Sequence, residues 1–219
     1  MTDFHISIHQ GFGVASALRY ASLAGIRFAG LVIPSDGTDL SRIADFSAQV
    51  RRLSLYANVE AWAGVELCHI PPALLPEAVR EAREAGARLV LVYGESIMDQ
   101  VDQGTNFAAI EAGADIVTHP GLVDAEAAAF AAERGVALEF TSCPRHALAN
   151  AHTASMAMKH GALLVRGSNA SRAEDLTTRA FWPLVIKGAD TGIVGENSVK
   201  LAEHLRKSEE LLIRKLMRP

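Results

Sequence analysis

Short strand-like runs of apolar residues alternate along the chain with stretches of helical periodicity. In the helix-like stretches the apolar positions recur every three to four residues, as between Leu40 and Leu53. Repeated strand–helix units with short connections predict parallel strands joined by right-handed crossovers. The seven predicted strands are Asp3–Ile8, Arg27–Ile33, Val59–Leu67, Arg88–Tyr93, Asp115–His119, Ala137–Thr141 and Leu163–Arg166.

Proline, glycine and capping residues predict where two of the helices begin and end. Pro72 and Pro76 open one helix and Gly86 closes it, because proline suits the first turn and glycine the position after the last. Asp124 is placed to cap a later helix that ends at Gly135.

Three further helices are predicted in the last third of the chain. One begins near Asn150 and ends at Gly161, and another begins at Ser171 and Glu174, which have capping-box spacing. An amphipathic helix rich in Lys, Arg and Glu covers about residues 193–217. We expect this last helix to pack on the fold with a solvated outer face, and a contact in a homo-oligomer is the alternative.

The first strand-like run favours a barrel over an open sheet. His5, Ser7 and His9 fall on one of its faces, and the apolar residues at positions 4, 6 and 8 fall on the other. An open sheet covered on both sides needs apolar residues on both faces, whereas a barrel can keep polar groups inside its mouth. We therefore predict an α/β fold, a seven-stranded TIM-like barrel, as one domain over residues 1–219.

Composition limits the classes of partner and location. The chain has 219 residues, 49% of them hydrophobic, and a net charge of −4, which argues against a nucleic-acid partner. The sequence lacks both the roughly 18-residue apolar run of a membrane span and an N-terminal signal-peptide pattern. We expect a cytoplasmic protein in which Cys68 and Cys143 are free thiols.

Residues suited to metal binding and acid–base chemistry gather at the predicted strand ends, where barrels of this kind carry their active sites. His5, Glu66 and His119 come from three different strands. Histidine and carboxylate ligands suit a divalent transition metal, which could activate water for hydrolysis. Glu66 is the hardest to explain otherwise, because a carboxylate inside an apolar strand needs a partner.

Several stretches resemble the PHP (polymerase and histidinol phosphatase) superfamily, particularly its histidinol-phosphatase-like proteins. The resemblance implies a distorted seven-stranded barrel that hydrolyses phosphoesters, or serves as a nuclease module, with up to three metals. The stretches that carry it are Asp3–His5, Gly64–Pro72, Gly104–Ala112, Asp115–Leu122 and His146–His152.

By this resemblance, the chain keeps only some of the metal ligands that the family uses. It carries metal ligands over to His5, Glu66 and His119, and one at Ser35-Asp36 with an uncertainty of one residue. Other ligand positions are substituted, and the residues found there are Ser7, Tyr93, Asn169 and Ser171. Because no site of the family is complete, we expect a reduced centre that holds at most one or two ions.

The first hypothesis is therefore a metal-dependent phosphoester hydrolase. His5, Glu66 and His119 would hold a single Zn, Mn or Fe, and Glu66, Asp36 or Glu95 would supply the catalytic carboxylate. A small phosphorylated or anionic substrate would meet Arg145 and His146, and the further candidates for substrate binding are Asn150 and His152.

Two alternatives require no metal. The substituted ligand positions favour a catalytically silent relative that binds a small anion or a protein partner. A ribonuclease P protein subunit has a related barrel, which raises RNA binding as a third hypothesis, and the acidic net charge makes it the weakest.

Overall fold

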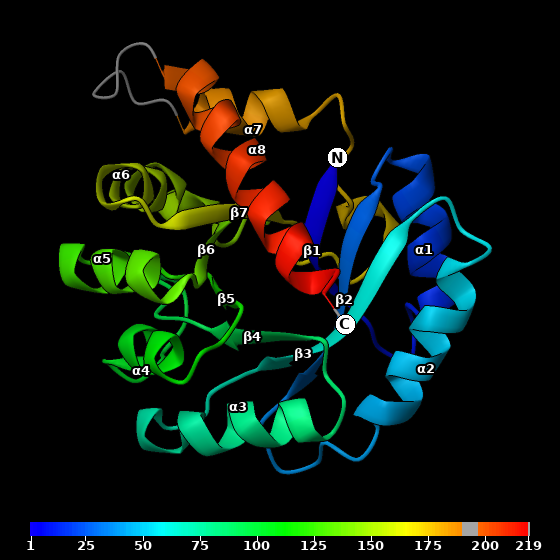
Figure 1. The fold of residues 1–219 in the computed structure, drawn as a ribbon. Coiled ribbons are helices and arrows are strands. Elements are labelled where there is room, and N and C mark those ends of the chain that lie inside the picture. The colour runs from blue at the N-terminus through cyan, green and yellow to red at the C-terminus, as the bar shows by residue number, and fades with distance from the viewer. Residues whose placement is uncertain (190–196, 219) are drawn as a thin grey trace.

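The computed structural model describes residues 1–189 and 197–218. Seven parallel strands follow one another in sequence order in a single sheet, with helices between them (Figure 1). The strands are β1 (Thr2–Ser7), β2 (Phe28–Ser35), β3 (Glu60–Leu67), β4 (Leu89–Tyr93), β5 (Ile116–Thr118), β6 (Ala137–Thr141) and β7 (Leu163–Gly167). All seven predicted strands are confirmed, with ends that agree to within two residues.

The helices surround the sheet. They are α1 (Val14–Leu23), α2 (Ile43–Ser54), α3 (Leu75–Glu84), α4 (Thr105–Glu111), α5 (Ala125–Arg134), α6 (Asn150–His160), α7 (Trp182–Gly188) and α8 (Asn197–Leu216), with short 3-10 turns η1 (Pro72–Leu74), η2 (Ala147–Ala149) and η3 (Ala173–Asp175). The predicted caps of α5 are confirmed, since the Asp124 side chain accepts a hydrogen bond from the Ala127 N–H and Gly135 is left-handed.

The prediction of a helix that begins at Ser171 is wrong. This segment forms only the short η3 turn, and no side chain caps it. The Ser171 carbonyl instead accepts a hydrogen bond from the His9 ring at 2.7 Å, which ties the segment to the end of β1. For the predicted C-terminal helix, residues 193–196 lie outside the described residues, and α8 is described from Asn197.

The sheet is nearly closed into a barrel. β1 and β7 meet through the segment that follows β7, where the Ser7 N–H donates to the Ala170 carbonyl at 2.8 Å. The Asp3 carboxylate adds a second link by accepting from the Ser168 N–H at 3.0 Å. The α/β barrel predicted from the sequence is therefore confirmed.

A bulge in β1 corrects the predicted face pattern. Asp3 pairs with Ala29 and Ile6 pairs with Leu31. The two pairs are three residues apart along β1 but only two apart along β2, so β1 contains one extra residue. Phe4 consequently joins the core inside the barrel, whereas Ile6 packs outside against α1. The prediction that positions 4, 6 and 8 share one outer face is wrong for Phe4.

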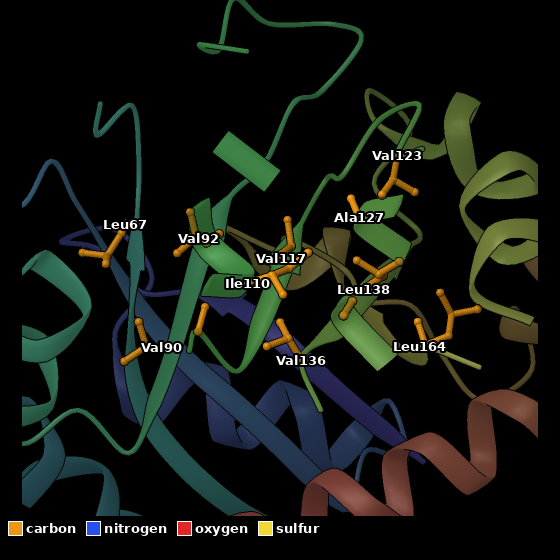
Figure 2. Close-up of a cluster of buried hydrophobic side chains, with 14 of the residues drawn as sticks. Leu67, Val90, Val92, Ile110, Val117, Val123, Ala127, Val136, Leu138 and Leu164 are labelled. Carbon is orange, nitrogen blue, oxygen red and sulfur yellow. The ribbon is translucent and has the colours of Figure 1, made fainter. Parts of the chain in front are cut away.

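The hydrophobic core has an outer and an inner part. Outside the barrel, apolar side chains of the strands pack against the helices, for example Val90, Val117 and Leu138 (Figure 2). Inside, every strand contributes to one apolar layer, which Leu212 and Leu216 of α8 complete. The strand residues of this inner layer are Phe4, Val32, Trp62, Leu89, Leu91, Ile116, Ala137 and Val165.

Helix α8 covers the end of the barrel at which the strands begin (Figure 1). The Arg166 guanidinium of β7 pairs with the Glu209 carboxylate of α8 in a largely buried contact, with one N–O distance of 2.6 Å. The opposite end, where the strands finish, is left for polar residues. No helix among the described residues has the length and apolar character needed to cross a membrane.

Candidate metal centre

The polar residues lie one layer above the inner apolar layer. Successive inward positions on a strand are two residues apart, so Ile116 is followed inside the barrel by Thr118, and Ala137 by Glu139. The same step leads along β3 from Trp62 through Gly64 to Glu66. Strand alternation thus carries two carboxylates into the barrel, Glu66 near the end of β3 and Glu139 in the middle of β6.

Glu139 links the two histidines that the sequence identified. Its Oε1 lies 2.8 Å from Nδ1 of His5, and its Oε2 lies 2.8 Å from Nδ1 of His119. The same Oε2 accepts a hydrogen bond from the His119 backbone N–H at 3.0 Å. All three side chains are buried, so they form a rigid bridge across the barrel from β1 to the ends of β5 and β6.

Glu66 lies on the other side of His5. Its Oε2 is 3.1 Å from Nε2 of His5, and its Oε1 accepts a hydrogen bond from the Thr118 hydroxyl at 2.7 Å. His5 is therefore held between two buried carboxylates. We call His5, Glu66, His119 and Glu139 the central cluster.

Electrostatics keep the carboxylates of this cluster ionised. Burial alone would raise the pKa of Glu66 and Glu139, but the adjacent histidines outweigh it and hold both pKa values below the usual range. Burial would likewise lower the pKa of His5, yet the Glu66 and Glu139 carboxylates raise it well above its ordinary value.

Backbone geometry at two points makes room for the cluster. His119 has a left-handed backbone with φ 47°, which is uncommon for a residue with a Cβ atom and turns its ring toward Glu139. At Gly167 a Cβ atom would lie 2.0 Å from Oε1 of Glu139 and 2.8 Å from Cβ of His5. Glycine is therefore required where β7 passes the cluster.

The donor set fits a divalent transition metal. His5, His119 and Glu139 each offer a ligand atom, and these atoms all lie within 4.8 Å of one another. Nε2 of His5 and Nδ1 of His119 are buried and close to carboxylate oxygens, but neither has a hydrogen bond of acceptable geometry. Two imidazoles with one or two carboxylates are ligands that suit Zn, Mn or Fe.

A cleft of about 760 Å³ opens above the cluster at the strand ends. Of the four cluster residues, Glu66 lines this cleft, together with Tyr93, Asn169 and His146. Nδ2 of Asn169 lies 3.2 Å from Nε2 of His119, which connects the cleft wall to the cluster. Two positions where the resemblance places a substituted ligand, Tyr93 and Asn169, therefore still adjoin the centre.

His146 forms part of the cleft wall as a neutral side chain. Its ring stacks on the ring of His119 with the centroids 3.8 Å apart, and its Nδ1 lies 2.9 Å from the Ser96 hydroxyl. Burial, followed by the charge of His119, lowers the pKa of His146 to about 4. Arg145 is exposed at the rim, where its guanidinium pairs with the Asp99 carboxylate, which also accepts a hydrogen bond from the Tyr93 hydroxyl.

Four of the residues predicted for the site lie outside the cleft. Asp36 is exposed and accepts hydrogen bonds from Thr38 in its own turn. Oε1 of Glu95 accepts hydrogen bonds from the backbone N–H groups at the start of α4, at 2.9 and 3.1 Å. Asn150 pairs through its amide with the backbone of Thr141, and the His152 ring contacts the Val123 carbonyl.

Glu139 is the cluster residue that the sequence analysis missed. The signal that drew attention to Glu66 is also present here, because Glu139 is a carboxylate in the middle of the apolar strand Ala137–Thr141. The sequence of this strand therefore contains a signal that predicts Glu139 as a site residue.

Comparison with known proteins gives one sequence relative and a set of similar folds. No family model matches the chain. An uncharacterized protein of Methanocaldococcus jannaschii is 35% identical over 127 residues, and the match covers 58% of this chain and 58% of that protein.

The similar structures share the barrel at low sequence identity. A chain in the cryo-EM structure of archaeal ribonuclease P with mature tRNA matches all of this chain and 94% of its own length, at 16% identity and a TM-score of 0.70. Adenine deaminase from Arthrobacter aurescens matches 93% of this chain with 76% of its own, at 12% identity and a TM-score of 0.59. A Zn-bound amidohydrolase from Burkholderia ambifaria matches 92% of this chain with 74% of its own length, at 14% identity and a TM-score of 0.51.

Proposed function

We propose that the chain is a metal-dependent hydrolase of PHP type that acts on a small phosphoester. The observation that carries this proposal is the convergence of His5, His119 and Glu139, whose ligand atoms lie within 4.8 Å of one another at the carboxyl ends of the strands. In barrels of this kind that end carries the active site.

His5, His119 and Glu139 would hold the ion, with Glu66 beside them. A divalent ion at this point would supply Lewis-acid activation for hydrolysis. The low pKa values of Glu66 and Glu139 support this assignment, because carboxylate ligands bind a metal in their ionised form. On binding the ion, His5 would have to give up the proton that its raised pKa favours, since a histidine ligand is neutral.

Glu66 is the best candidate for a proton acceptor. It is the cluster carboxylate that lines the cleft, and the Thr118 hydroxyl fixes one of its oxygens at 2.7 Å. An ionised, oriented carboxylate can take a proton from an attacking water within hydrogen-bond reach. The Asn169 amide and the neutral His146 ring would orient the substrate from the cleft wall.

The phosphoester class rests on the PHP resemblance and on Arg145. A guanidinium at the rim of the cleft can bind a phosphate through two parallel hydrogen bonds. The Asp99 carboxylate pairs with this guanidinium. A substrate phosphate would therefore have to replace Asp99 as the partner of Arg145.

The test is phosphate release from a panel of small phosphomonoesters, with Zn, Mn or Fe(II) added to metal-stripped protein. We expect turnover that Glu139→Gln and Glu66→Gln each reduce by at least about a hundredfold, in line with the loss of a metal ligand or a proton acceptor. Glu133→Gln, a change at an exposed glutamate of α5, should leave turnover unchanged. Metal-independent turnover, or equal turnover in all three variants, would exclude the proposed mechanism.

A second candidate function is metal-free binding of a small anion or a protein. It is favoured by the contacts within the central cluster, in which each carboxylate already lies against at least one histidine ring. Under this alternative the protein would bind phosphate equally well before and after treatment with a chelator, and the phosphoester panel would show no turnover.

A further inference from the structure

A second groove, of about 720 Å³, lies at the opposite end of the barrel from the central cluster. It is lined by residues at the start of β2 and β3, by one side of α2 and by Met217, which directly follows α8. Because the central cluster lies where the strands end, the two sites are separated by the apolar layer inside the barrel. This groove therefore takes no part in the proposed hydrolysis.

Positive charge gathers in this groove although the chain as a whole is acidic. Arg27, Arg51 and Arg88 line it, and Glu60 is the one acidic residue among the described residues of its lining. Within residues 1–189 and 197–218, no acidic side chain forms an ion pair with Arg27 or Arg51. Arg88 is oriented by hydrogen bonds from Nε and Nη2 to the Leu216 carbonyl.

Aromatic and apolar surface lies beside these arginines. The Phe28 and Trp62 rings are nearly parallel, at 10°, with centroids 6.2 Å apart, and Phe28 is only half-buried. Leu55 is 78% exposed at the rim. Flat aromatic surface next to guanidinium groups is the combination that binds a planar ring carrying a phosphate.

We propose that this basic groove is a binding site for a nucleotide unit, a phosphate ester that carries a planar ring. Arg27 and Arg51 would bind the phosphate, since the guanidinium fork matches phosphate oxygens. The ring would pack against Phe28 and the exposed Leu55. The unit could be a free nucleotide or one residue of a single-stranded nucleic acid.

The surface beside the groove helps to distinguish a free nucleotide from a single-stranded nucleic acid as the ligand. A neighbouring hollow of about 350 Å³ contains Arg19 and Tyr56, and Ala57 and Asn58 line both hollows. Tyr56 is 87% exposed. A second stacking ring and a further arginine one step along the surface suit a strand of more than one nucleotide.

The experiment measures fluorescence anisotropy of a labelled 12-nucleotide oligouridylate with the full chain, at several salt concentrations. We expect Arg27→Gln with Arg51→Gln to weaken binding by about tenfold or more, because two charge-assisted contacts are lost. The salt dependence of the logarithm of the affinity should also fall by about 0.7 for each phosphate contact removed. The matched control is Arg80→Gln with Arg206→Gln, two exposed arginines on α3 and α8.

Competition with AMP and the variant Tyr56→Ala distinguish the two sources. Displacement of the oligonucleotide by AMP at a similar concentration, with no effect of Tyr56→Ala, would indicate a free nucleotide. Weak competition by AMP, with a loss of oligonucleotide affinity in Tyr56→Ala, would indicate a single strand. The proposal is overturned if neither probe binds at low salt, or if the two arginine pairs are equally affected.

The result of the oligonucleotide-binding experiment does not depend on whether the chain is a hydrolase. Treatment with a chelator should leave oligonucleotide binding unchanged, because the central cluster does not line this groove. Circular dichroism would show that the Arg27 and Arg51 variants remain folded, as expected for exposed side chains.

Discussion

At the scale of single residues, Glu139 is the centre of the candidate site. Each of its two oxygens contacts a different histidine, so one carboxylate orders ligands from two strand ends. His5, Glu66 and His119 were predictable from the sequence because histidines and a glutamate stand out in or next to the predicted strands. Glu139 was missed although it too is a carboxylate inside an apolar strand, and only its contact with His5 on β1 depends on closure of the barrel.

Replacing Glu139 tests whether this connection stabilises the fold. Glu139→Gln removes one partner of a buried charged network, and we expect the free energy of unfolding to fall by about 3–5 kcal/mol. Urea denaturation measures it, with Glu133→Gln as the control on the exposed face of α5. A loss no larger than that of the control would mean that the carboxylate is not paired as described.

Gly167 gives a second prediction at this scale. Gly167→Ala would place Cβ 2.0 Å from Oε1 of Glu139, and we expect overpacking to cost about 1–3 kcal/mol and to weaken metal binding. Gly188→Ala is the control, because a Cβ atom there meets no described atom outside its own helix within 4 Å. Equal unfolding midpoints for the two variants would contradict the tight fit beside β7.

At the scale of elements, alternation and capping residues predicted most of what the structure contains. The strands were predictable because each is a run of apolar residues bounded by turns, and Asp124 and Gly135 were predictable because caps are local. The bulge in β1 was not, since it exists only in the pairing with β2. The capping-box spacing at Ser171 failed because His9 binds the Ser171 carbonyl.

Replacing Glu95 would distinguish a role in capping α4 from a role in catalysis. Its carboxylate binds the N–H groups of Gly104 and Asn106 at the start of α4, so we expect Glu95→Ala to cost about 1 kcal/mol of stability. Phosphoester turnover per folded molecule should stay unchanged. Loss of turnover without loss of stability would instead support the catalytic carboxylate considered from the sequence.

At the scale of the whole molecule, α8 completes the barrel from the end opposite the cleft. Leu212 is 1% exposed and packs on the inner apolar layer, whereas its neighbour Leu211 is 52% exposed. The amphipathic pattern predicted this helix, but not that it covers the strand starts, because the choice of face depends on the assembled barrel.

The two leucines form a matched pair for testing that arrangement. We expect Leu212→Ala to lower the free energy of unfolding by about 2–5 kcal/mol, and Leu211→Ala to change it by less than about 0.5 kcal/mol. Both are measured by urea denaturation. Similar effects of the two substitutions would show that α8 does not pack on the barrel through Leu212.

Metal content is the most direct test of the central claim, that the central cluster is a metal centre. The protein would be dialysed against micromolar Zn, Mn or Fe(II) and the bound metal measured by elemental analysis. We predict a single equivalent per chain in the unmodified protein and in Glu133→Gln, and its loss in Glu139→Gln. A folded, unmodified protein that retains no metal under these conditions would contradict the account.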